Sequence, residues 1–90
     1  MSKANVDPAE LRRFANDLKR FTADLESLLG QLHSRMNNLE ATWRDQEQRK
    51  FAEAFAETAK NLSVFVNAAS EHSAFLNKKA MLVEQYLRQR

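Results

Sequence analysis

Apolar side chains recur every three or four residues through the first half of the chain. This spacing is typical of a helix that buries one face, because one helical turn takes 3.6 residues. Asp7 suits the N-cap, Pro8 suits the first helical position, and Glu10 stands three residues after the cap. We therefore predict a helix over residues 8–43 and expect it to tolerate Gly30 in its interior. The stripe consists of Leu11, Phe14, Leu18, Phe21, Leu25, Leu28, Leu32, Met36, Leu39 and Trp43.

A second apolar stripe follows in the other half of the chain, with alternating steps of four and three as far as Leu76. Alanines flank this stripe, which permits a neighbouring helix to approach closely. The pattern predicts a second helix over residues 46–87. Its stripe consists of Phe51, Phe55, Thr58, Leu62, Phe65, Ala69, His72, Leu76, Val83 and Leu87.

Neither Gly nor Pro separates the two stripes, so periodicity alone is compatible with one very long helix. Such a helix would be about 120 Å long and would leave its apolar stripe exposed. Asp45 and Gln48, however, have the spacing of a capping box, which predicts a new helix start. We predict a bend at residues 43–45 and an antiparallel helical hairpin, an all-α fold forming a single domain over residues 1–90.

A two-helix hairpin buries only one seam, and the chain holds more large apolar residues than one seam needs. The surplus predicts a second hairpin packed on the first by two-fold symmetry, giving a four-helix bundle. The residues expected in the core and dimer seam are Leu18, Leu25, Leu32, Leu39, Leu62, Phe65 and Leu76.

The composition gives no indication of nucleic-acid binding, membrane insertion, metal binding or catalysis, and so favours a protein that binds other proteins. The 14 Lys and Arg against 12 Asp and Glu alternate in sign, so no basic stripe for nucleic acid is expected. The apolar runs are too short for a membrane span. The chain has no Cys, and neither His33 nor His72 has the spacing of a metal-ligand pair. We expect no catalytic residues, no metal and no cofactor.

The single Trp of the sequence, Trp43, stands at the predicted bend. One interpretation is that Trp43 closes the end of the hairpin against Phe51 and Phe55. The other is that it forms a recognition anchor, because exposed aromatic residues dominate many binding surfaces. The sequence leaves both interpretations open.

In this arrangement the chain resembles the WXG-motif (Trp-x-Gly) family of type VII secretion proteins. Trp43-Arg44-Asp45 occupies the motif position, with Asp45 in place of Gly, and Phe51 matches the aromatic residue of the following helix. The resemblance implies hairpins that dimerise with a copy or a paralogue and that are exported, or assist export, through a membrane ATPase. It also implies a C-terminal Tyr-x-x-x-Asp/Glu signal. The sequence does not match this signal, because the residue four positions after Tyr86 is Arg90 and not an acid.

The sequence thus predicts an interaction protein similar to type VII substrates or their dimerising partners. The residues expected at the recognition tip are Trp43, Arg44, Asp45, Phe51 and Phe55. Residues 1–5 do not open a signal peptide, so we expect synthesis in the cytoplasm and secretion without a cleaved leader. The alternative is a cytosolic coiled-coil adaptor that assembles through the same hairpin and is not exported.

Overall fold

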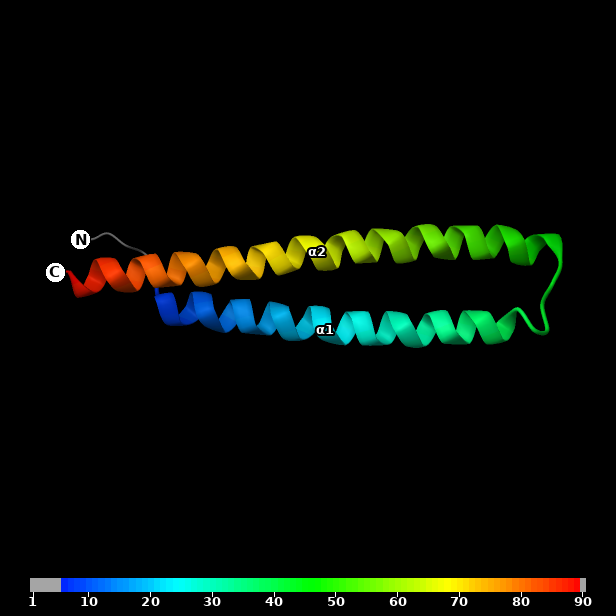
Figure 1. Cartoon of the computed structure of the whole chain (residues 1–90), viewed down its shortest axis with the longest axis horizontal. Coiled ribbons are helices and arrows are strands. Elements are labelled where there is room, and N and C mark those ends of the chain that lie inside the picture. Colours follow the sequence, from blue (N-terminus) through cyan, green and yellow to red (C-terminus); the bar gives the residue numbers. More distant parts are fainter. Residues whose placement is uncertain (1–5, 90) are drawn as a thin grey trace.

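The computed structural model describes residues 6–89, and these form two helices joined by one short connection (Figure 1). Helix α1 spans Pro8–Leu39 and helix α2 spans Gln46–Arg88. The two helices run antiparallel, so the predicted all-α hairpin is confirmed. The expectations for residues 1–5 and for Arg90 lie outside the described residues.

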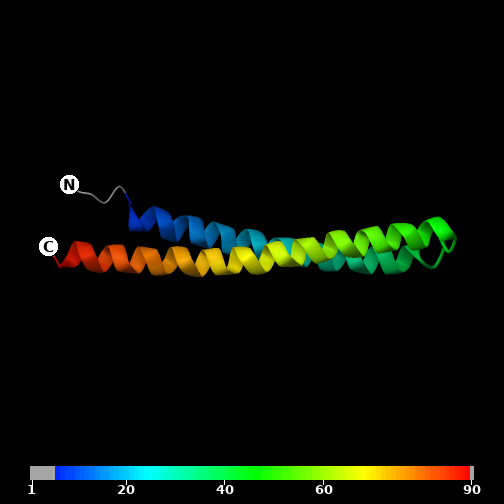
Figure 2. The same cartoon turned by 90° about the horizontal axis from the view of Figure 1, so that it is seen from above.

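The hairpin is a thin rod of 68 × 17 × 14 Å, and the two helices cross at a shallow angle near its middle (Figure 2). Its radius of gyration is 20.2 Å, whereas a compact domain of this length has about 12 Å. The accessible surface is 7057 Å², against about 5,400 Å² for a globular monomer of this mass. The molecule therefore exposes far more surface than a folded domain of its size normally does.

Both helix starts follow the predicted chemistry. The Asp7 carboxylate accepts a hydrogen bond from the Ala9 N–H at 2.9 Å, and Pro8 occupies the first turn of α1. The predicted partner of this cap, Glu10, pairs with Arg13 instead of completing a capping box. Helix α1 continues through Gly30 without interruption, as expected.

The first helix ends at Leu39, four residues earlier than predicted, and the connection covers residues 40–45. The Leu39 carbonyl accepts hydrogen bonds from the N–H groups of Thr42 and Trp43, at 3.1 and 3.0 Å. The Thr42 hydroxyl donates to the same carbonyl at 3.3 Å. These turn hydrogen bonds satisfy the end of α1, so residues 40–43 leave the helix without a glycine.

Asp45 caps α2, as predicted, with its carboxylate accepting from the Gln48 N–H at 2.9 Å. The Gln48 side chain does not return to the cap; it lies buried beneath the bend and donates to the Glu40 carboxylate at 3.4 Å. We expect Asp45→Ala to lower the free energy of unfolding by about 1 kcal/mol, because the Gln48 N–H loses its acceptor and the N-terminus of α2 loses a negative charge. Thermal melts measure this change. Asp45→Asn is the control and should keep most of the stability, and equal loss in both variants would contradict the capping role.

The seam between the helices is built from small and medium side chains. Among residues 6–89, no large side chain is fully buried. The residues predicted for the core and dimer seam fall into two groups: Leu18, Leu25, Leu62 and Leu76 are half-buried, and Leu32, Leu39 and Phe65 are exposed. The residues buried in the seam are Ala15, Thr22, Met36, Gln48, Ala59, Val66, Ala69, Ser73, Ala80 and Val83.

Small residues occupy the seam because they let the two helices approach closely. Ala15 is 0% exposed, and the Ser73 hydroxyl on α2 donates to its carbonyl oxygen at 3.0 Å. The Thr22 hydroxyl is satisfied within α1 by the Lys19 carbonyl at 2.9 Å. Polar side chains are therefore buried here with their hydrogen bonds made.

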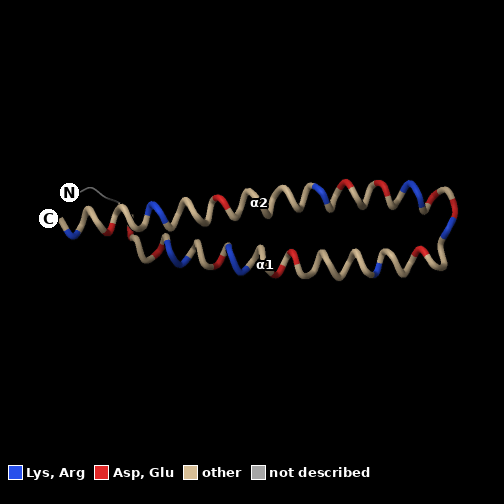
Figure 3. Tube along the Cα trace, viewed as in Figure 1, with Lys and Arg blue, Asp and Glu red and all other residues tan. Residues whose placement is uncertain are grey.

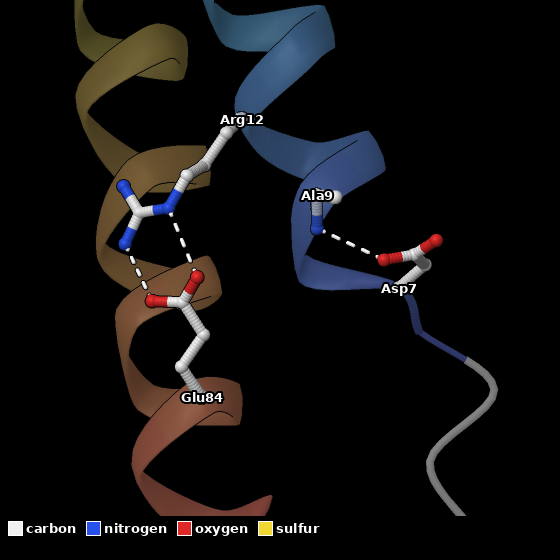
Figure 4. Close-up of polar contacts among 4 residues, drawn as sticks. All are labelled: Asp7, Ala9, Arg12 and Glu84. Carbon is white, nitrogen blue, oxygen red and sulfur yellow. Dashed lines mark hydrogen bonds and ion pairs between the residues drawn. The ribbon is translucent and has the colours of Figure 1, made fainter.

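An ion pair joins the helices at the open end of the hairpin (Figure 4). Arg12 donates to both carboxylate oxygens of Glu84, from Nη2 at 2.7 Å and from Nε at 3.2 Å. This hydrogen bonding lowers the pKa of Glu84 and raises the pKa of Arg12. The pair fixes the register of the two helices at the end opposite the bend.

Since the pKa of Glu84 is lower in the folded than in the unfolded state, the pair stabilises the fold above the unfolded pKa of about 4.3. That stability is lost as the pH falls through the folded pKa. We expect Glu84→Gln to melt below the wild-type protein at pH 7 and at the same temperature as the wild type in strong acid. Glu26→Gln, on an exposed acid, is the control. A melting difference that persists unchanged in strong acid would contradict the role of the ion pair.

Candidate interaction surface along one flank and the bend

One side of the hairpin carries large apolar residues that the seam does not bury. We call this surface the flank. The apolar residues of α1 and those of α2 lie on the same side of the hairpin. This follows because the ring of Phe21 in α1 meets that of Phe65 in α2 edge to face, with the ring centroids 6.2 Å apart. The sequence carries no charged residue over 27–34 in α1 and over 61–70 in α2, so each helix has one long uncharged stretch (Figure 3). The exposed members of the flank are Phe14, Phe21, Leu28, Leu32, Leu39, Phe51 and Phe65.

Aromatic rings continue the flank to the bend. Trp43 is half-buried and lies against Phe51 at a ring-centroid distance of 5.8 Å. Phe51 in turn stacks with Phe55 at 6.3 Å, and the His33 ring meets the edge of Phe55 at 5.5 Å. Trp43 therefore rests on the aromatic run of α2 and keeps part of its surface exposed at the tip.

An apolar hollow of about 190 Å³ lies between the helices next to this aromatic run. Its walls are apolar except for Arg35, and it opens on the side where Leu39 and Phe51 are exposed. Such a hollow between two helices accepts an apolar side chain from a partner helix, as a knob enters a hole in a bundle. The lining residues are Leu32, Arg35, Met36, Leu39, Phe51 and Phe55.

A second hollow near the bend has the opposite character. It measures about 520 Å³ and is lined by charged and amide side chains, among them Glu40, Arg44 and Arg49. Arg44 also donates from Nε to the Glu40 carbonyl at 3.2 Å, which ties the connection back to the end of α1. The bend therefore presents an apolar surface on one side and a polar one on the other.

The structure brings the predicted tip residues Trp43, Phe51 and Phe55 into one aromatic run, with Arg44 and Asp45 in the connection beside it. Their role in recognition stays a prediction. Of the predicted seam residues, Leu32, Leu39 and Phe65 lie on the flank, where a second hairpin could cover them.

Two members of the second predicted stripe, Thr58 and His72, are exposed and do not belong to the core. They stand at heptad positions shared with Phe51 and Phe65, so they continue the flank and not the seam.

Within residues 6–89, no group of three or more His, Asp or Glu is placed to hold a metal ion. In the same range, neither helix is long and apolar enough to cross a membrane.

The fold and the bend together define an elongated helical hairpin with a tryptophan at its connection. The family of proteins of about 100 residues with a Trp-x-Gly motif, WXG100, matches residues 3–86, and the chain belongs to this family. It is accordingly a small helical-hairpin protein similar to type VII secretion substrates.

Solved structures of the secreted protein EsxB from Bacillus anthracis str. Sterne have the same fold. The wild-type EsxB structure is 24% identical, covers 94% of this chain and 99% of its own, and has a TM-score of 0.83. A single-substitution variant of EsxB is 23% identical, covers 92% of this chain and 99% of its own, and also has a TM-score of 0.83. No curated protein matches the chain significantly in sequence.

The Asp in place of the motif glycine has a structural explanation. Asp45 has φ −99° and ψ −173°, an extended conformation that any residue adopts. Among residues 6–89, no backbone position has a positive φ. This bend therefore does not need a glycine, and Asp45 adds the stronger capping interaction.

Proposed function

We propose that the protein is a binding protein of type VII secretion that pairs with a second hairpin through the flank, forming a four-helix bundle. The flank carries the proposal: its phenylalanines and leucines are among the most exposed apolar side chains in residues 6–89, while the seam holds only small and medium ones. A four-helix bundle packs around a core of apolar residues that its helices contribute, and the flank supplies such residues from both helices of this hairpin. A second copy of the chain is the partner we propose, and a paralogous hairpin is the alternative partner.

We further propose that the secretion machinery recognises the bend of the folded dimer. Trp43 supports this, because its ring is held by Phe51 and remains partly exposed at the end of the rod. A large aromatic group held rigidly at a tip loses little entropy on binding and is a common hot spot. The ATPase of the secretion system is the proposed partner at this tip, and no nucleic acid, cofactor or catalytic step is involved.

Export from cells tests the proposal directly. The wild-type protein should appear in the culture medium of cells with an intact type VII ATPase and not of cells in which that ATPase is inactive. Appearance in neither medium would favour the cytosolic adaptor and overturn the export assignment.

Trp43→Ala separates recognition from folding. Because Trp43 lies outside the seam, the variant should keep its helicity and its dimer mass and lose export. Loss of helicity would instead show that Trp43 closes the hairpin as a core residue, whose truncation costs about 3–5 kcal/mol. Export equal to the wild type would contradict recognition of the bend. Lys50→Ala, at an exposed position next to Phe51, is the control for a change near this end of the rod.

A further inference from the structure

The side of α2 turned away from α1 carries apolar residues that neither the seam nor the flank uses. In Figure 1 no other described element lies over this side of α2. Phe75 is 65% exposed, more than any other large apolar side chain in residues 6–89, and Val64 is 60% exposed. Leu82 and Tyr86 continue the row toward the C-terminal end of α2 and are also exposed.

These residues form one stripe on the helix, which we call the outer stripe. Its steps follow the sequence four, three, four, four, three, four, which fits one face of a helix. The two halves of the stripe on either side of Phe75 therefore have the same spacing. Its members are Val64, Ala68, Glu71, Phe75, Lys79, Leu82 and Tyr86.

The symmetric spacing makes the outer stripe complementary to itself. When two copies pack antiparallel about a two-fold axis at Phe75, residues at equal distances before and after Phe75 meet. Glu71 of one copy then faces Lys79 of the second copy, and Ala68 meets Leu82. The small Ala68 leaves room for the larger Leu82, and Val64 at one end meets Tyr86 at the other.

Charge and exposure both favour this pairing. Glu71 and Lys79 are exposed, and neither has an ion-pair partner among residues 6–89. Glu84, the acid nearest to the C-terminal half of the stripe, is held by Arg12. The charges of the stripe are thus available to a second molecule and have opposite signs at related positions.

We propose that the outer stripe is a second self-association surface, at which α2 of one copy packs antiparallel on α2 of another. Its centre, Phe75, comes ten residues after Phe65 and therefore lies about 80° around α2 from it, so the outer stripe borders the flank. Contacts on the two surfaces would join paired hairpins into larger assemblies. A contact along a single helix buries a small area, so the association is weak and reversible. We therefore expect it to form only at high local concentration. The partner at this surface is the chain itself.

Sedimentation equilibrium of the full chain over a range of rising concentrations tests the proposal. The wild-type mass should pass from two chains to a larger assembly. Glu71→Lys and Lys79→Glu should each weaken the larger assembly about tenfold, because each replaces two symmetric attractions by two repulsions. The double variant with both changes should restore it. Glu53→Lys, the same charge change outside the stripe, should leave it unchanged.

A wild-type mass that stays at two chains at all concentrations, in a dimer that Glu71→Lys leaves intact, would overturn the proposal and leave the outer stripe to a different partner. A double variant that fails to recover, or a Glu53→Lys variant as weak as Glu71→Lys, would also overturn it. If the flank did not pair, the wild-type protein would form only a dimer that Glu71→Lys weakens and Phe65→Asp leaves intact. That result would contradict the proposed function and support the outer stripe, so the two failures are distinguishable.

Discussion

Replacing Phe65 with aspartate is expected to leave a helical hairpin that no longer pairs through its flank. Phe65 lies near the middle of the flank against Phe21, within residues 61–70 of α2, which hold no charged residue. Pairing would bury a carboxylate there in each copy, without a partner, and would lose two aromatic contacts. The association constant should fall at least about a hundredfold, which light scattering on a size-exclusion column detects as a loss of dimer at about 10 µM.

The matched control for this change is Asn67→Asp. Asn67 is exposed on the same helix, two residues from Phe65, and therefore points away from the flank. It should keep the dimer mass, and both variants should remain helical by circular dichroism. Equal loss of dimer in the two variants, or an intact dimer with Phe65→Asp, would contradict pairing through the flank.

The second large effect concerns the seam within one hairpin. Ala15 is fully buried at a point where α2 lies close enough for Ser73 to bond its carbonyl oxygen. We expect Ala15→Asp to lower the free energy of unfolding by about 3 kcal/mol or more, because a charge is placed at a position that water does not reach. Chemical denaturation followed by circular dichroism measures the loss.

Ala23→Asp supplies the control for this second prediction. Ala23 lies on the same helix and is exposed, so the same substitution carries the helix-propensity cost without the burial. It should change the stability by less than about 1 kcal/mol. If the two variants were equally stable, the close approach of the helices at Ala15 would be wrong.

The chain reversal and both helix starts could be predicted from the sequence, because local chemistry decides them. Asp7 with Pro8, and Asp45 three residues before Gln48, supply acceptors for first-turn N–H groups whatever the rest of the chain does. The end of α1 could not be predicted in the same way. It is made by turn hydrogen bonds to the Leu39 carbonyl, and no Gly or Pro marks it in the sequence.

The small residues buried between the two helices could not be predicted from a count of apolar positions, because large side chains dominate such a count. Such a count identifies the whole apolar face of each helix, which includes both the seam and the flank. It does not show which residues of that face contact the other helix. The closest approach selects the smallest residues, which here are Ala15 and Thr22 on α1 and Ala59, Ser73 and Ala80 on α2. These small residues are seven or fourteen positions apart along each helix. This heptad spacing of small residues is the feature of the sequence from which the seam could have been predicted.

The bend residues show a further limit of sequence reasoning. Trp43 had two interpretations, and the structure combines parts of both, because the ring rests on Phe51 and stays partly exposed. Local spacing predicted that Trp43, Phe51 and Phe55 lie near one another. The hollow beside them could not be predicted, since it depends on how Leu32 and Leu39 of α1 meet α2.

The central claim is that a second hairpin covers the flank. The mass of the protein in solution tests this claim most directly. Sedimentation equilibrium of the wild-type chain at about 10 µM should give twice the chain mass of 10.4 kDa. A mass of one chain at this concentration, with helicity intact, would contradict self-association through the flank.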